Sequence, residues 1–135
     1  MITEKHKKYF DVACSISKLS NFTREKLGAV VVSKNWDIIG VGYNDRKTHP
    51  YQAAIAKRLG LDEKIFLHAE FAALVAAKQR NLYGARVFVY REFRSGELAM
   101  SRPCPICMSY IKELGIKDIY YTTDEGYCYE RITSI

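Results

Sequence analysis

Long apolar runs are missing from this sequence of 135 residues. No stretch approaches the roughly 20 consecutive apolar residues that a membrane-spanning helix needs. The polar, basic residues 1–8 are not followed by the apolar core of a signal peptide. Internal repeats, low-complexity segments and linker-like stretches are missing as well. These absences predict a cytoplasmic protein without a membrane partner, folded as a single domain over residues 1–135.

Cysteine is scarce, and two of the four cysteines lie close together. Cys104 and Cys107 form a Cys-x-x-Cys pair, whereas Cys14 and Cys128 lie elsewhere in the chain. Nothing marks the chain as secreted, so structural disulfides are not expected. In a reducing compartment the Cys-x-x-Cys spacing indicates metal binding or redox chemistry, and the two isolated cysteines are expected to be inert thiols.

Acidic residues are outnumbered by basic ones, 15 to 21, which gives a net charge of +6. Such a charge attracts anionic partners, either the phosphate of a small nucleotide or the backbone of a nucleic acid. The same lysines and arginines are scattered along predicted helices and turns, where they also serve to solvate the surface. Charge alone therefore leaves these interpretations open.

Hydrophobic periodicity predicts alternating strands and helices. Residues 27–33 and 36–43 are rich in β-branched side chains and read as an antiparallel hairpin. Helices are predicted over residues 4–19, 50–59, 68–80 and 104–114, and further strands over 86–90, 119–123 and 127–132. The order predicts an α/β fold, a three-layer αβα sandwich with a mixed sheet of roughly five strands and a C-terminal β-hairpin.

Three residues with metal-binding side chains lie at predicted helix N-termini: His68, Cys104 and Cys107. One imidazole and two thiolates suit zinc, and three protein ligands leave the fourth position free, as in catalytic zinc sites. Glu70, two residues after His68, can lie beside such a metal and move protons without binding it. Taken singly, His68 is also explained as a helix cap or as a hydrogen-bonded core histidine, and the cysteines as a redox pair. A redox pair leaves His68 and Glu70 without a role.

These residues also match a known signature. The segments HAE (68–70) and PCPIC (103–107) follow the pattern H-x-E…P-C-x-x-C, and the chain therefore resembles the zinc-dependent cytidine and deoxycytidylate deaminases. The resemblance implies a cytidine deaminase-like fold, Zn²⁺ held by His68, Cys104 and Cys107, and Glu70 as the catalytic proton shuttle. A zinc-stabilised interaction module without turnover is the alternative, but it has no use for Glu70.

The resemblance also implies contacts with the substrate. Asn44, in Gly-Tyr-Asn, resembles the family residue that contacts the sugar, and Ala69 and Pro103 are expected beside the metal pocket. Arg91, Arg94 and Arg102 cluster around the loop before the cysteines, where an arginine either clamps a 5′-phosphate, follows a nucleic-acid backbone or solvates its loop. His49 either lines the pocket mouth or is a solvated loop residue.

The segment from residue 47 to residue 68 resembles small, phage-type proteins of the deoxycytidylate deaminase group, which implies hydrolysis of dCMP to dUMP. Ala72 stands where larger members have Asn, and a C-terminal hairpin is more typical of free-nucleoside deaminases and toxin-type relatives. We therefore expect a small nucleotide or nucleoside as substrate. Free cytidine or deoxycytidine, or a cytosine or adenine in single-stranded DNA or RNA, are the alternatives. Relatives are often oligomers, which implies a homo-oligomer here.

Overall fold

The computed structural model describes residues 2–61 and 66–133. Its helices and strands follow the order expected from the sequence. They are α1 (Glu4–Ser17), β1 (Leu27–Val32), β2 (Ile38–Tyr43), α2 (Pro50–Arg58), α3 (Ala69–Ala76), β3 (Arg86–Arg91), α4 (Pro105–Glu113), β4 (Asp118–Thr123) and β5 (Gly126–Arg131). Within the described ranges, no helix is both long and apolar enough to cross a membrane.

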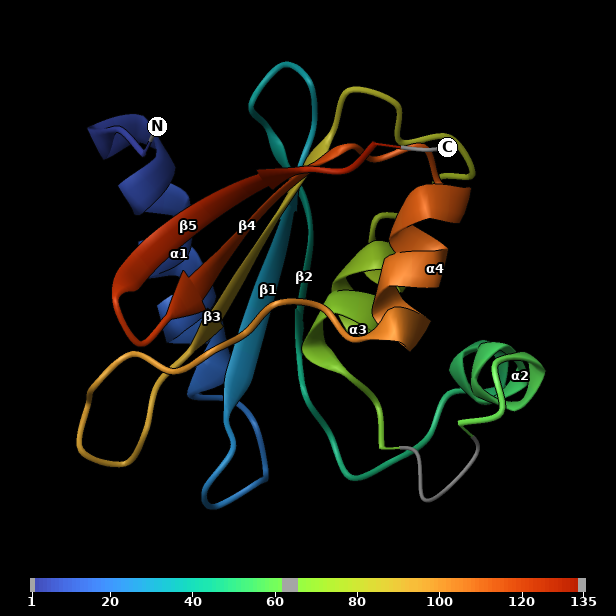
Figure 1. Ribbon diagram of the computed structural model, residues 1–135, viewed down its shortest axis with the longest axis horizontal. Helices are drawn as coiled ribbons and strands as arrows, with labels where there is room; N and C mark the ends of the chain where they lie inside the picture. The colour runs from blue at the N-terminus through green and yellow to red at the C-terminus, as the bar shows by residue number, and fades with distance from the viewer. Residues whose placement is uncertain (1, 62–65, 134–135) are drawn as a thin grey trace.

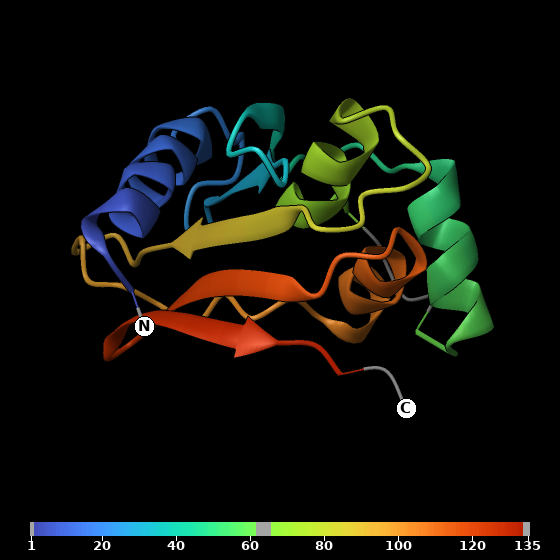
Figure 2. The same cartoon turned by 90° about the horizontal axis from the view of Figure 1, so that it is seen from above.

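The strands form one five-stranded mixed sheet in the order β2-β1-β3-β4-β5. Only β3 and β4 pair in parallel, joined by the crossover through α4, and the other neighbours are antiparallel. Helix α1 covers one face of the sheet, and α3 and α4 lie on the other (Figure 1). Helix α2 packs on α4, at the end of the molecule away from α1 (Figure 2). The predicted layered α/β fold and its C-terminal hairpin are confirmed.

Apolar side chains fill both spaces between the sheet and its helices. Val30 and Val32 of β1 pack with Phe10 of α1 on one face, while Val31 packs with Leu74 of α3 on the other. Because successive side chains of a strand point to opposite faces, a strand covered on both faces is apolar throughout. The unbroken apolar run of β1 therefore follows from its central position in the sheet.

The approach of α3 to β2 depends on glycine. A Cβ atom on Gly42 would lie 2.6 Å from the carbonyl oxygen of Ala69, the first residue of α3. A Cβ atom on Gly40 would lie 3.0 Å from the backbone nitrogen of Ala77, just after the helix. Since α3 rests on strand backbone along its length, the position of its N-terminus is fixed by the sheet.

Two predicted helices are shorter than expected. The helix predicted over residues 68–80 ends at Ala76, because Lys78 adopts a positive φ of 54° that leaves the helical region. The chain then turns so that the Leu82 N–H donates to the Leu114 carbonyl at 2.7 Å, next to the end of α4. The helix predicted over residues 4–19 ends at Ser17.

Candidate active site

The candidate metal ligands lie at the N-termini of two neighbouring helices. His68 is the N-cap residue of α3, Cys104 is the N-cap residue of α4, and Cys107 lies in the first turn of α4. Helix N-termini carry partial positive charge and unpaired N–H groups, so they favour thiolates and bound anions. The fold thus brings together residues that lie 36 and 39 positions apart in the sequence.

The geometry of these side chains fits a tetrahedral zinc ion. The ligand atoms of His68, Cys104 and Cys107 lie within 4.8 Å of one another. The Nδ1 atom of His68 is 3.3 Å from the sulfur of Cys107 and 3.4 Å from that of Cys104. With Zn–S near 2.3 Å and Zn–N near 2.0 Å, tetrahedral angles would separate N and S by about 3.5 Å. The three residues therefore fit a zinc site of the His-Cys-Cys type.

Burial and mutual hydrogen bonds set the protonation of the two thiols. The hydrogen bond from the Cys107 thiol, together with that from His68, outweighs burial and lowers the pKa of Cys104 to about 4. Burial, together with that same hydrogen bond, raises the pKa of Cys107. A divalent cation at the same point would stabilise both sulfurs as thiolates.

Glu70 lies next to this cluster, in the first turn of α3, and is only 4% exposed. Its Oε1 atom has no hydrogen-bond partner among the described residues. Burial raises the pKa of Glu70, although the charge of His68 opposes this. Because an unpaired buried oxygen is costly, its place beside three potential ligands fits a site built to receive a metal ion and a reacting molecule.

Gln52 of α2 holds His68 in place and was not identified from the sequence. Its side chain is fully buried, its Oε1 accepts a hydrogen bond from the His68 N–H at 3.0 Å, and its Nε2 donates to the Phe66 carbonyl at 2.7 Å. Both polar ends of the amide are therefore satisfied by the segment that leads into α3. A glutamine within a predicted amphipathic helix gives no signal of this role.

A cavity of about 270 Å³ opens over the cluster. His68, Ala69, Glu70 and Cys104 lie on its metal side. Phe22 and Phe66 form an apolar wall with their rings in an edge-to-face arrangement, 5.4 Å between centroids. The remaining lining residues are Glu25, Leu27, Asn44, Leu67, Arg91, Met100, Ser101 and Arg102. The cavity thus combines an apolar wall with polar groups, as small-molecule sites do.

Asn44 lines the cavity, but its amide is engaged within the protein. Its Oδ1 accepts from the Leu27 N–H at 2.9 Å, and its Nδ2 donates to the Glu25 carbonyl. In this structure Asn44 therefore fastens the wall formed by residues 25–27. Sequence reasoning missed the lining residues Phe22 and Glu25, since both come from a loop without a motif.

Arg102, Pro103 and His49 differ in their relation to the cavity. Arg102 lines it, while its guanidinium donates to the Glu130 carboxylate at 2.8 and 2.9 Å. Pro103 is buried before Cys104, and neither it nor His49 is among the described residues that line the cavity. The Nδ1 atom of His49 accepts a hydrogen bond from the Tyr51 N–H at 3.1 Å and caps α2.

Comparisons with known proteins agree with this geometry. Residues 3–123 match the family model described as the cytidine and deoxycytidylate deaminase zinc-binding region. The chain is 27% identical to the deoxycytidylate deaminase of Mycobacterium phage D29, over 84% of this chain and 90% of the relative. A crystal structure of dCMP deaminase from the cyanophage S-TIM5 is similar, with 29% identity, a TM-score of 0.64 and coverage of 91% and 86%. Cytidine deaminase from Burkholderia pseudomallei shares the fold, with a TM-score of 0.65, 18% identity and coverage of 96% and 93%.

Proposed function

The chain belongs to the cytidine and deoxycytidylate deaminase zinc-binding family, and from this premise we propose that it hydrolyses the exocyclic amine of a cytosine nucleotide, with dCMP as its preferred substrate. In this proposal His68, Cys104 and Cys107 hold Zn²⁺ and Glu70 is the catalytic proton shuttle. The observation that carries the proposal is the buried Glu70 carboxylate beside the His-Cys-Cys cluster, at the side of a cavity.

The chemistry divides between the metal and the protein. When bound, zinc lowers the pKa of water and so supplies a nucleophile at neutral pH. Glu70 takes up a proton at its buried carboxylate, delivers it to the ring nitrogen of the base and then assists departure of the amine as ammonia. The apolar wall of Phe22 and Phe66 limits access of solvent to the ring. Ala69, at the first position of α3, offers an N–H group without an intrahelical acceptor.

Two observations support a nucleotide as the substrate. The relatives named above include deoxycytidylate deaminases, and the S-TIM5 enzyme has been crystallised with dCMP and dUMP, at 28% identity to this chain. Arg91 lines the cavity, and among the described residues its guanidinium makes only long contacts, 3.3 Å to the Met100 carbonyl and 3.5 Å to Glu25. It is therefore better placed than Arg102, which pairs with Glu130, to bind a 5′-phosphate.

An ammonia-release assay over dCMP, deoxycytidine, cytidine, cytosine and single-stranded DNA tests the proposal, with the zinc content measured on the same sample. We expect zinc to be present and dCMP to give the highest kcat/KM. Arg91→Gln should raise KM for dCMP and leave KM for deoxycytidine nearly unchanged, because only dCMP carries the phosphate. Fastest turnover of single-stranded DNA, with steep salt dependence, would instead identify a polynucleotide deaminase. A zinc-free protein without activity would overturn the proposal.

A further inference from the structure

A second hollow, of about 290 Å³, shares a wall with the catalytic cavity. In the segment that leads into β1, Phe22, Glu25 and Leu27 line the catalytic cavity. The intervening residues Thr23, Arg24 and Lys26 line the second hollow. The rest of its lining comes from the end of α1 and from the segment after β3, and consists of Ser17, Lys18, Glu92 and Arg94. Three segments that are distant in sequence thus bring four cationic side chains around one concavity.

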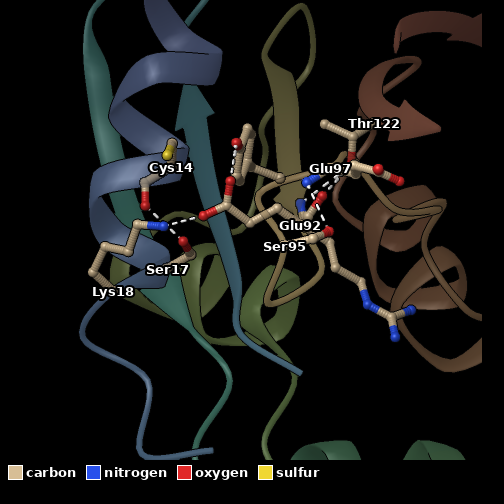
Figure 3. A network of polar contacts seen from close by, with 9 residues as sticks. Cys14, Ser17, Lys18, Glu92, Ser95, Glu97 and Thr122 are labelled. Atoms are coloured by element: carbon tan, nitrogen blue, oxygen red, sulfur yellow. Dashed lines mark hydrogen bonds and ion pairs between the residues drawn. The ribbon is translucent and has the colours of Figure 1, made fainter. Parts of the chain in front are cut away.

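The one carboxylate in this lining is already neutralised. Glu92 forms an ion pair with Lys18, and it also accepts a hydrogen bond from the Tyr90 hydroxyl at 2.8 Å. Figure 3 shows Lys18 reaching from α1 toward the Glu92 carboxylate. This ion pair joins the end of α1 to the segment after β3. Because Lys18 compensates the negative charge of Glu92, that carboxylate does not neutralise the other cations of the hollow.

The remaining cations of the hollow lack a counter-charge. Among the described residues, the side chains of Arg24, Lys26 and Arg94 have no ion-pair or hydrogen-bond partner. The Thr23 hydroxyl, in the same lining, is a further possible donor. Converging cations produce a positive potential, and guanidinium groups match the geometry of phosphate oxygens. The hollow therefore offers donors and charge suited to an anion with several oxygens.

We propose that this hollow is a phosphate-binding site, distinct from the catalytic cavity, with Arg24, Lys26 and Arg94 as its cationic residues. Its ligand chemistry is that of clustered phosphate oxygens, as in a free polyphosphate or along a nucleic-acid backbone. Because Asn44 ties Glu25 and Leu27 of the shared wall, an anion held by Arg24 and Lys26 would contact the same segment that borders the substrate. Binding of the anion itself does not depend on the proposed deaminase activity.

Binding of tripolyphosphate by isothermal titration calorimetry tests the proposal on the zinc-loaded protein. The double variant Arg24→Gln/Arg94→Gln is compared with Lys57→Gln/Arg58→Gln, which removes the same charge from exposed positions on α2. We expect the first variant to weaken binding at least about tenfold, as loss of charged hydrogen bonds does, and the control by less than about twofold. Equal weakening in both variants, or no binding by the wild type, would overturn the proposal.

A thymidine-only oligonucleotide separates the two sources of phosphate, since it contains no base for deamination. If the site takes a nucleic-acid backbone, the Arg24→Gln/Arg94→Gln variant binds the oligonucleotide more weakly than the control does, with a smaller salt slope. If it takes small polyphosphates, the oligonucleotide binds equally to both variants while tripolyphosphate does not. Thermal melting of each variant checks the fold, and Lys26→Gln provides a third, independent substitution.

Discussion

At the scale of single residues, Glu70 combines deep burial with an Oε1 atom that has no partner among the described residues. We expect Glu70→Gln to lower kcat by about 10²–10⁴-fold, the usual contribution of a general acid–base group. Because glutamine has nearly the same shape without the charge, zinc content and melting temperature should be retained. Ammonia release, zinc analysis and thermal melting measure the three quantities, and wild-type turnover by this variant would exclude the assigned role.

Gln52 offers a test of how the metal ligand is positioned. Gln52→Leu removes the acceptor of the His68 N–H and leaves that partly buried group unpaired, which costs about 1–3 kcal/mol. Groups that hydrogen-bond to a metal-binding residue and hold it in position typically affect metal affinity by about 10–100-fold. We therefore also expect weaker zinc binding. Competition with a chromogenic chelator measures the affinity. Gln79→Leu, at an exposed position after α3, is the matched control and should leave zinc binding unchanged.

Site residues were predictable from the sequence where they lie close together in short motifs. His68, Glu70, Cys104 and Cys107 lie within two compact motifs, and the structure brings the three metal-binding side chains together. Partners distant in sequence were not predictable. The Asn44 amide is occupied by Leu27 and Glu25, and Arg102 pairs with Glu130, through contacts that no local pattern encodes.

At the scale of elements, the first turn of α1 contains a titratable cap. The Thr3 N–H donates to His6 Nδ1 at 3.0 Å, an arrangement that requires an unprotonated nitrogen. Burial, with the charges of Arg86 and Lys5, lowers the pKa of His6. Because the unfolded chain, with a histidine pKa of about 6.5, then takes up the proton first, stability falls as the pH drops below about 6.5.

Thermal melting between about pH 7.5 and about pH 5.5 checks this expectation, with a loss of at most about 1 kcal/mol from the cap. His6→Gln is the control, since glutamine at this position keeps a capping acceptor without titrating. The wild type should lose more stability than His6→Gln on acidification. Parallel curves for the two proteins would contradict the role of His6, because other titrating groups are common to both.

The contact between α3 and β2 leaves no room for a side chain at Gly42, where an added Cβ would lie 2.6 Å from the Ala69 carbonyl. Gly42→Ala should therefore destabilise the protein by about 1–3 kcal/mol, the range of overpacked cores. Since α3 carries Glu70 and follows His68, kcat should fall as well. Denaturant unfolding and the ammonia assay measure both effects. Val41→Ala, at a partly exposed position on the same strand, should leave kcat unchanged.

The elements themselves were largely predictable, because strands buried on both faces and amphipathic helices have distinct periods. The ends of α1 and α3 were not. The predicted extension of α3 to residue 80 fails at Lys78, whose positive φ lets the chain reach the end of α4 through Leu82. Helix ends of this kind depend on tertiary packing rather than on local preference.

At the scale of the whole molecule, a zinc ion would join α3 to α4. We expect removal of the metal with a chelator to cost about 3 kcal/mol at a hundredfold excess of free zinc over its Kd, and to lower Tm by about 10 °C. Adding zinc back should restore the Tm, whereas adding zinc-free buffer should not. Cys104→Ser/Cys107→Ser is the control and should melt at one temperature with or without chelator. If the Tm of the wild type were unchanged by the chelator, the prediction of a bound zinc ion would be wrong.

Strand β3 separates the two motifs along the chain. His68 and Glu70 precede β3, whereas Cys104 and Cys107 follow it, and the exposed turn at residues 93–96 lies between them. A cleavage in that turn would divide the protein into two fragments, neither with a full set of ligands. Reassembly of the fragments would then be coupled to metal uptake, which makes this turn the natural point at which to split the protein into a zinc-reporting pair.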